Sequence, residues 1–121
     1  MTEPGFEQAA SRLNTDRGET LRRIADLEQE FAAIVASTRD GSAGSDDEHD
    51  PEGATVAFER QHVAALLTGD QEHLAATEAA LRKLESGRYR ICDSCGGPIG
   101  DERLAARPAS LTCVRCAGKR R

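Results

Sequence analysis

Two Cys-x-x-Cys pairs near the C-terminus constrain the fold of this chain more than any other feature of its sequence. The pairs are Cys92–Cys95 and Cys113–Cys116, they contain all four cysteines, and residues 96–112 separate them. Two residues between paired cysteines let both sulfurs of a tight turn face one point about 2.3 Å away, as tetrahedral zinc requires. The separation of the pairs also suits a four-cysteine zinc site. The sequence therefore predicts that Cys92, Cys95, Cys113 and Cys116 bind Zn²⁺.

Other uses of four cysteines fit the sequence less well. Two disulfides need an oxidising compartment, and residues 1–20 show no basic segment followed by an apolar one, as a secretory signal would. A thioredoxin-like redox pair leaves the second pair without a role, and no βαβ pattern surrounds it. Four thiolates close the shell of a zinc ion and leave no position for water or substrate. We therefore expect the zinc to be structural.

Two segments ahead of the cysteines carry narrow apolar stripes. Residues 6–38 and 56–84 place apolar side chains at alternating intervals of three and four, which is typical of a coiled-coil seam. Residues 40–53 between them are rich in turn formers, so the chain is expected to reverse there. The sequence thus predicts a mostly α fold, with a long antiparallel coiled-coil hairpin over residues 1–85 and a small zinc-finger module over residues 86–121.

A register for the hairpin follows from matching the two stripes. Setting Leu13 against Leu74 places Arg17 opposite Asp70. We expect these two residues to form an interhelical ion pair that specifies register more than it stabilises, because a partly buried pair offsets its own desolvation cost. The alternative is that the segment Thr68–Asp70 interrupts the second helix.

The expected tip of the hairpin is acidic. Six acidic residues lie between Asp40 and Glu52, with no Lys or Arg among them. Asp50 suits the cap of the second helix, and Pro51 suits its first turn. Capping does not explain the three consecutive acids Asp46–Glu48, because their negative charges repel one another. The tip is either a flexible, solubilising loop or a set of carboxylates at the end of a rod, able to reach a metal or the basic groups of a partner.

The formal net charge of −5 is unevenly distributed. From Ser86 onward eight basic residues stand against three acidic ones, which gives +5 at this end and −10 over residues 1–85. A basic end suits nucleic acid or an acidic protein surface, or is an ordinary solvated surface. The acidic remainder argues against a dedicated nucleic-acid binder. No apolar run approaches the length that crosses a bilayer, so we expect a cytoplasmic protein without membrane association.

The C-terminal segment carries a specific motif. Residues 87–99 read Gly-Arg-Tyr-Arg-Ile-Cys-Asp-Ser-Cys-Gly-Gly-Pro-Ile, and residues 103–108 read Arg-Leu-Ala-Ala-Arg-Pro. Together with the hairpin and the acidic turn, these motifs resemble the DksA/TraR family of bacterial RNA polymerase regulators. The resemblance is dense over residues 78–116 and looser over both helices. It implies a zinc-binding transcription regulator that is not an enzyme.

The resemblance also implies a mode of action. Family members insert the hairpin into the secondary channel of RNA polymerase with the tip towards the active site, in several cases together with the alarmone ppGpp, while the other end grips the channel rim. By this resemblance, Asp47 and Asp50 are the residues expected to make the contact at the tip. The best-known members carry Asp-x-x-Asp-x-Ala there. Aligned on Asp50, this chain has Gly53 in place of the second aspartate; aligned on Asp47, it keeps both aspartates and ends in Glu52. Polymerase binding is therefore expected, with a regulatory effect that differs or is absent. The residues expected at the rim, or on nucleic acid, are Arg88, Arg90, Arg103 and Arg107.

Two other interpretations remain open. A zinc-ribbon adaptor would bind nucleic acid directly through these arginines and Arg115, and a hairpin scaffold would bind some other protein with an inert tip. A hydrolase is not expected, because the sequence shows no nucleophile–base pair and the metal site is closed. The leading interpretation is a monomeric regulator that binds RNA polymerase and does not recognise DNA by sequence.

Overall fold

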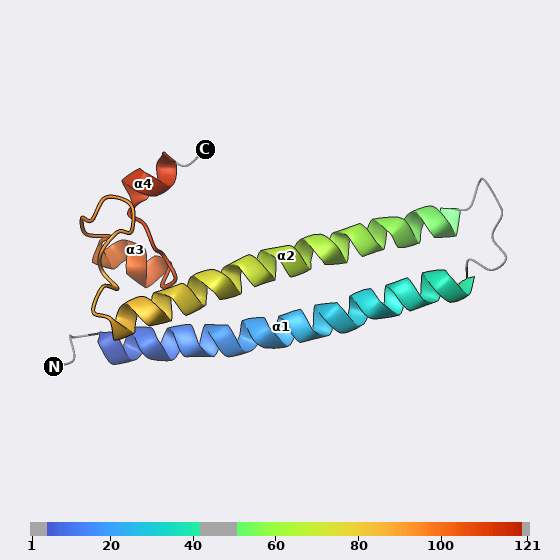
Figure 1. The fold of residues 1–121 in the computed structure, drawn as a ribbon, viewed down its shortest axis with the longest axis horizontal. Coiled ribbons are helices and arrows are strands. Elements are labelled where there is room, and N and C mark those ends of the chain that lie inside the picture. The colour runs from blue at the N-terminus through green and yellow to red at the C-terminus, as the bar shows by residue number, and fades with distance from the viewer. Residues whose placement is uncertain (1–4, 42–50, 120–121) are drawn as a thin grey trace. The chain divides into compact units, whose positions relative to one another are not determined.

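The computed structural model describes residues 5–41 and 51–119, and this part of the chain is mostly helical (Figure 1). Two long helices form a hairpin, and a C-terminal segment with short helices follows, which confirms the expected fold class. The described helices are, in chain order, α1 (Phe6–Gly41), α2 (Pro51–Glu85), α3 (Asp101–Ala106) and α4 (Val114–Gly118). The only β-pairing within the described ranges is an isolated antiparallel bridge between Ile91 and Pro98. None of the described helices is both long and apolar enough to span a bilayer.

Both long helices extend beyond the apolar stripes that predicted them. Helix α2 begins at Pro51, a position where the fixed φ of proline suits a first helical turn. It continues without a break through Thr68–Asp70, so the alternative of an interrupted second helix is wrong. Its last turn carries Arg82 and Lys83, whose positive charges favour the negative end of the helix dipole.

The chain divides into two compact units, one of Met1–Thr20 with His73–Arg121 and one of Leu21–Glu72. Each long helix contributes a segment to both units. In the second unit Ile24 and Val63 are buried, in agreement with the predicted seam. The expected module boundary near residue 85 stays a prediction.

The ion pair expected between Arg17 and Asp70 is wrong. Asp70 pairs instead with Arg23, whose Nε lies 3.4 Å from Oδ2 of the carboxylate. Arg17 pairs with Glu78, Nε to Oε2, at 3.0 Å. All four side chains are between one fifth and one half exposed, so these pairs contribute about 0–1 kcal/mol each and do not fix the register.

The register is set at the base of the hairpin by apolar packing. Leu13 forms a core cluster with Ala80 and Leu84, instead of the expected pairing with Leu74. Tyr89 and Leu111 of the C-terminal segment pack against the same cluster. Because leucine and alanine recur along both stripes, several registers satisfy the pattern. The contacts that Tyr89 and Leu111 make favour the observed register. The apolar pattern of the two helices does not contain these contacts.

Next to this cluster, two polar residues of α1 and α2 occupy buried positions in the seam between the helices. Thr20 and Thr77 are completely buried, although both interrupt the apolar stripes. The Thr20 hydroxyl donates to Oδ1 of Asp16 at 3.3 Å, and Oδ2 of the same carboxylate lies 2.7 Å from Nε2 of His73. His73 thereby joins α2 to α1 through Asp16.

Replacing Thr77 with valine is expected to stabilise the protein. The Thr77 hydroxyl is buried and has no hydrogen-bond partner among the described residues, so folding removes it from water without compensation. Valine has nearly the same shape and a similar helix propensity, and it avoids this desolvation cost. We expect the unfolding free energy to rise by about 1 kcal/mol, measured by urea denaturation of the zinc-loaded protein. Thr77→Ser, which keeps the hydroxyl, is the control and should show no gain.

Candidate metal centre

The first cysteine pair lies in a tight turn that backbone hydrogen bonds hold closed. Gly96 has a φ of 76°, a left-handed conformation that glycine adopts without steric cost. Its N–H donates to the carbonyl of Cys92 at 2.9 Å, and the N–H of Cys92 donates to the carbonyl of Gly97 at 2.7 Å. The turn therefore places the Cys92 and Cys95 side chains on one side.

The second pair lies at the start of α4. Cys113 occupies the N-cap position of this helix, and Cys116 follows within it. Arg103 of α3 supports the approach to this pair, because its Nε donates to the carbonyl of Thr112 at 2.8 Å. Cys92 and Cys113 are buried with Ile99 and Leu104 in one core cluster. The two pairs are thus packed together by the small core of the module.

The four sulfurs form one compact group. Their Sγ atoms all lie within 4.8 Å of one another, and Cys95 Sγ is 3.9 Å from Cys113 Sγ. Four sulfurs bound tetrahedrally at about 2.3 Å lie about 3.8 Å apart. A disulfide would need about 2.05 Å, and all four cysteines are free. The arrangement fits a metal ion at its centre and not a pair of disulfides.

Backbone N–H groups donate hydrogen bonds to cysteine sulfurs of this cluster and thereby stabilise the thiolate form. Cys92 Sγ accepts from the N–H of Ser94 at 3.4 Å and from that of Cys113 at 3.3 Å. Burial raises the pKa of the Cys92 thiol, yet the N–H groups of Cys95, Cys113 and Ser94 outweigh it and lower this pKa to about 6. Backbone hydrogen bonding from Cys116 likewise lowers the pKa of Cys113, against the opposing effect of burial.

The cluster needs a cation to ionise completely. The side-chain hydrogen bond between Cys116 and Cys113 raises the pKa of Cys116 to about 12, and burial acts in the same direction. A divalent cation supplies the positive charge that lets all four thiols become thiolates. Soft, d¹⁰ Zn²⁺ suits four thiolates in a tetrahedron. When bound, zinc acts here as a structural cross-link, because the four sulfurs complete its coordination.

Comparison with known proteins places this geometry in a family. The model of the prokaryotic dksA/traR C4-type zinc finger matches residues 87–121. The structure of transcription factor DksA2 from Pseudomonas aeruginosa is similar over 98% of this chain and 89% of that one, with a TM-score of 0.53 and 25% identity. Residues 87–121 form a dksA/traR C4-type zinc finger, and the chain as a whole is similar to DksA proteins. The four cysteines of this zinc finger form its structural zinc site.

Other relatives match most of this chain but only about half of their own length. The uncharacterized protein YteA of Bacillus subtilis is 31% identical over 114 residues, which are 93% of this chain and 47% of YteA. The RNA polymerase-binding transcription factor DksA of Escherichia coli is 32% identical over 92 residues, 74% of this chain and 58% of that protein. The chain thus spans about half the length of these curated relatives.

Sequence reasoning missed the residue that ties the zinc module to the hairpin. The Lys83 side chain, at the end of α2, is only 10% exposed, and its Nζ lies 3.0 Å from Oδ1 of Asp93. The same Nζ donates to the carbonyl of Ile91 at 2.6 Å and to that of Leu111 at 3.5 Å. Asp93 lies within the first cysteine pair. A lysine in the last turn of a helix is normally a solvated residue, so its sequence position gave no signal of this role.

Tyr89 is the second connection. Its hydroxyl donates to the carbonyl of Pro108 at 2.7 Å, and its ring packs against both core clusters, one around Cys92 and Cys113 and one around Leu13. Pro108 directly follows the short helix α3 and its C-cap, Arg107. The tyrosine three residues before the first cysteine therefore belongs to the structural core of the module.

The arginines predicted for the rim differ in their surroundings. Arg88 and Arg107 are exposed. Arg90 Nη1 lies 3.6 Å from Oδ1 of Asp101, and Arg103 is held on the Thr112 carbonyl. Asp47 and Asp50, predicted for the tip contact, lie outside the described residues.

Proposed function

We propose that this protein regulates transcription by binding RNA polymerase, without enzymatic activity of its own. The observation that carries the proposal is the likeness to DksA2 over 98% of this chain, hairpin and zinc module together. Relatives at 32% identity are RNA polymerase-binding transcription factors. The closed four-sulfur site supports a structural role for the metal, because it leaves no position for a substrate.

The hairpin suits insertion into the secondary channel with its tip towards the active site. Helix α1 has 36 residues, which correspond to about 54 Å at 1.5 Å per residue. A hairpin of two helices is a suitable element for carrying charge into a confined channel. We propose that Asp47 and Asp50 act at the tip, that Arg88 and Arg107 contact the channel rim, and that the protein acts as a monomer. The proposal assigns no residue to ppGpp.

The proposal predicts that the zinc-loaded protein retains purified bacterial RNA polymerase in a pull-down. The double variant Asp47→Asn/Asp50→Asn should bind polymerase with similar affinity, because the rim contacts persist, and should lose most of its effect on transcription in vitro. Asp46→Asn, a change of an acid outside the Asp-x-x-Asp motif, is the matched control. Failure of the wild-type protein to bind polymerase would refute the proposal. Equal effects of all three proteins on transcription would refute the role of the tip.

Direct binding of nucleic acid is a second candidate, favoured by the exposure of Arg88, Arg107 and Arg115. A protein that uses these side chains on phosphates would bind duplex DNA without polymerase, and its affinity would fall steeply with salt. We expect no such binding at physiological salt, because Arg90 and Arg103 already interact within the module. Fluorescence anisotropy with a labelled duplex at two salt concentrations decides between the two functions.

A further inference from the structure

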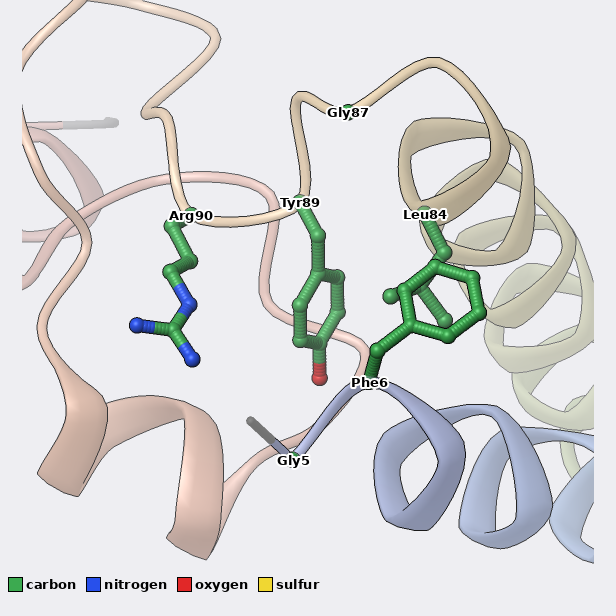
Figure 2. A pocket seen from close by; sticks show the side chains of 6 residues that line it. All are labelled: Gly5, Phe6, Leu84, Gly87, Tyr89 and Arg90. Atoms are coloured by element: carbon green, nitrogen blue, oxygen red, sulfur yellow. The ribbon is translucent and has the colours of Figure 1, made fainter. Parts of the chain in front are cut away.

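A hollow adjoins the zinc module at the beginning of α1. Its volume is about 300 Å³, and its walls come from α1, from the Tyr89–Arg90 segment and from α3 with Pro108. A smaller cavity of about 60 Å³ shares Tyr89 and Arg90 and is bounded by Phe6 and Leu84 (Figure 2). All of these residues belong to one compact unit. The larger volume reaches the lower end of the range for small-ligand sites.

The hollow exists because small residues meet across it. Ala9 of α1 and Ala105 of α3 line it together with Gly5, and none of the three fills the space between the helices. Leu104 and Pro108 add apolar surface to the same wall. Larger side chains at the two alanines would close the hollow.

Positive charge gathers at this hollow. Arg12 and Arg90 both line it, and Figure 2 shows the Arg90 side chain extending beside the Tyr89 ring. Burial raises the pKa of the Tyr89 phenol, while the guanidiniums of Arg12 and Arg90 act to lower it, so both charges lie near this ring. Among the described residues of the lining, Asp101 is the one carboxylate, and its side chain is 84% exposed. Among the described residues no carboxylate pairs with Arg12.

We propose that this hollow binds a small organic anion, a phosphate or carboxylate group attached to a short apolar chain. The anionic group lies between the guanidiniums of Arg12 and Arg90, and it displaces the exposed Asp101 carboxylate from Arg90. The apolar part lies against Leu104 and Pro108. Guanidinium groups match both phosphate and carboxylate through paired N–H donors. This site goes beyond the proposed function, which assigns no polymerase contact to Arg12 or Arg90.

The fluorescence of Tyr89 offers a direct test, because the chain has one tyrosine and no tryptophan. Zinc-loaded protein is titrated with butyl phosphate, butyrate and 1-butanol. We expect saturable binding of at least one of the two anions with a dissociation constant of about 1 mM or tighter, and no saturation with the alcohol. The anion that binds more tightly identifies the chemical group. Lack of saturation with both anions, or equal binding of the alcohol, would overturn the proposal.

Variants separate the site from general charge effects. Arg12→Gln and Ala9→Leu should each weaken binding about tenfold or more, one by removing a guanidinium and the other by filling the hollow. Arg22→Gln, which removes an exposed arginine of α1 outside the lining, should leave binding unchanged. Asp101→Asn should tighten binding several-fold, because it removes a competing carboxylate. Zinc content and melting temperature show that each variant is folded. Equal affinity of Arg12→Gln and Arg22→Gln would contradict the proposed site.

Discussion

Cys92→Ser is expected to abolish stable zinc binding and unfold the C-terminal module. Cys92 is 1% exposed, and its sulfur accepts two backbone N–H groups, so this ligand is also part of the core. Structural zinc sites in small domains contribute about 10–16 kcal/mol of apparent binding free energy at neutral pH, and much of it depends on the fourth thiolate. The measurements are zinc content by mass spectrometry under native conditions and the fluorescence of Tyr89, which packs on the same core.

The control for this variant is Ser94→Ala. Ser94 is an exposed residue between the two cysteines, and its backbone N–H, which the substitution keeps, is the group that contacts Cys92. It should keep a full equivalent of zinc. Retention of tightly bound zinc by Cys92→Ser would show that the site does not need four thiolates.

Zinc affinity should rise with pH. The pKa of Cys92 is lowered to about 6, so this thiol is largely ionised at neutral pH, whereas the pKa of Cys116 is raised to about 12 and its proton must leave when zinc binds. Protons therefore compete with the metal, and binding weakens as pH falls. Competition with a chromophoric chelator between pH 8 and pH 6 measures this change. An affinity independent of pH over that interval would contradict the assignment of Cys116 as a ligand that ionises on binding.

Lys83→Met is expected to lower the unfolding free energy by about 2–3 kcal/mol. The substitution keeps the aliphatic stem but leaves the carbonyl of Ile91 without the donor at 2.6 Å and Asp93 without its ion pair. Hydrogen bonds from charged groups contribute about 1.5–3 kcal/mol when one end is buried. The Asp93 side chain is half exposed, so solvent screening reduces the contribution of the Lys83–Asp93 ion pair to the unfolding free energy. Urea denaturation of the zinc-loaded protein measures the loss.

Arg82→Met is the matched control, because Arg82 is an exposed basic residue in the same turn of α2. It should change stability by no more than about 0.5 kcal/mol. Lys83→Met should also release zinc to a chelator faster, since Lys83 contacts Asp93 within the first cysteine pair. Equal stability of the two variants would show that the buried ammonium does not join the module to the hairpin.

The local patterns of the sequence predicted the elements of this fold. The apolar stripes indicated two long helices, and α1 and α2 follow them with a few residues added at the ends. The cysteine spacing indicated a zinc module, and the four sulfurs lie together. Both predictions succeeded because helix formation and a cysteine turn depend on residues that are close in the chain.

The pairing of the helices was not predictable in the same way. The expected Arg17–Asp70 pair was wrong, and Leu13 packs with Ala80 instead of Leu74. A repeated apolar stripe is compatible with several registers of the two helices. Long exposed side chains such as arginine form ion pairs with the acidic residue that the register brings near. Lys83 and His73 likewise gave no signal in the sequence, because their partners Asp93 and Asp16 become neighbours only in the folded chain.

The sequence by itself determined the two long helices and the zinc ligands, because both depend on short-range spacing. The tertiary structure alone decided which residues join the hairpin to the module, and it alone revealed a basic hollow between Ala9 and Ala105. Such features arise where segments distant in sequence pack together. Their energies depend on burial and on distances between side chains, which residue order does not specify.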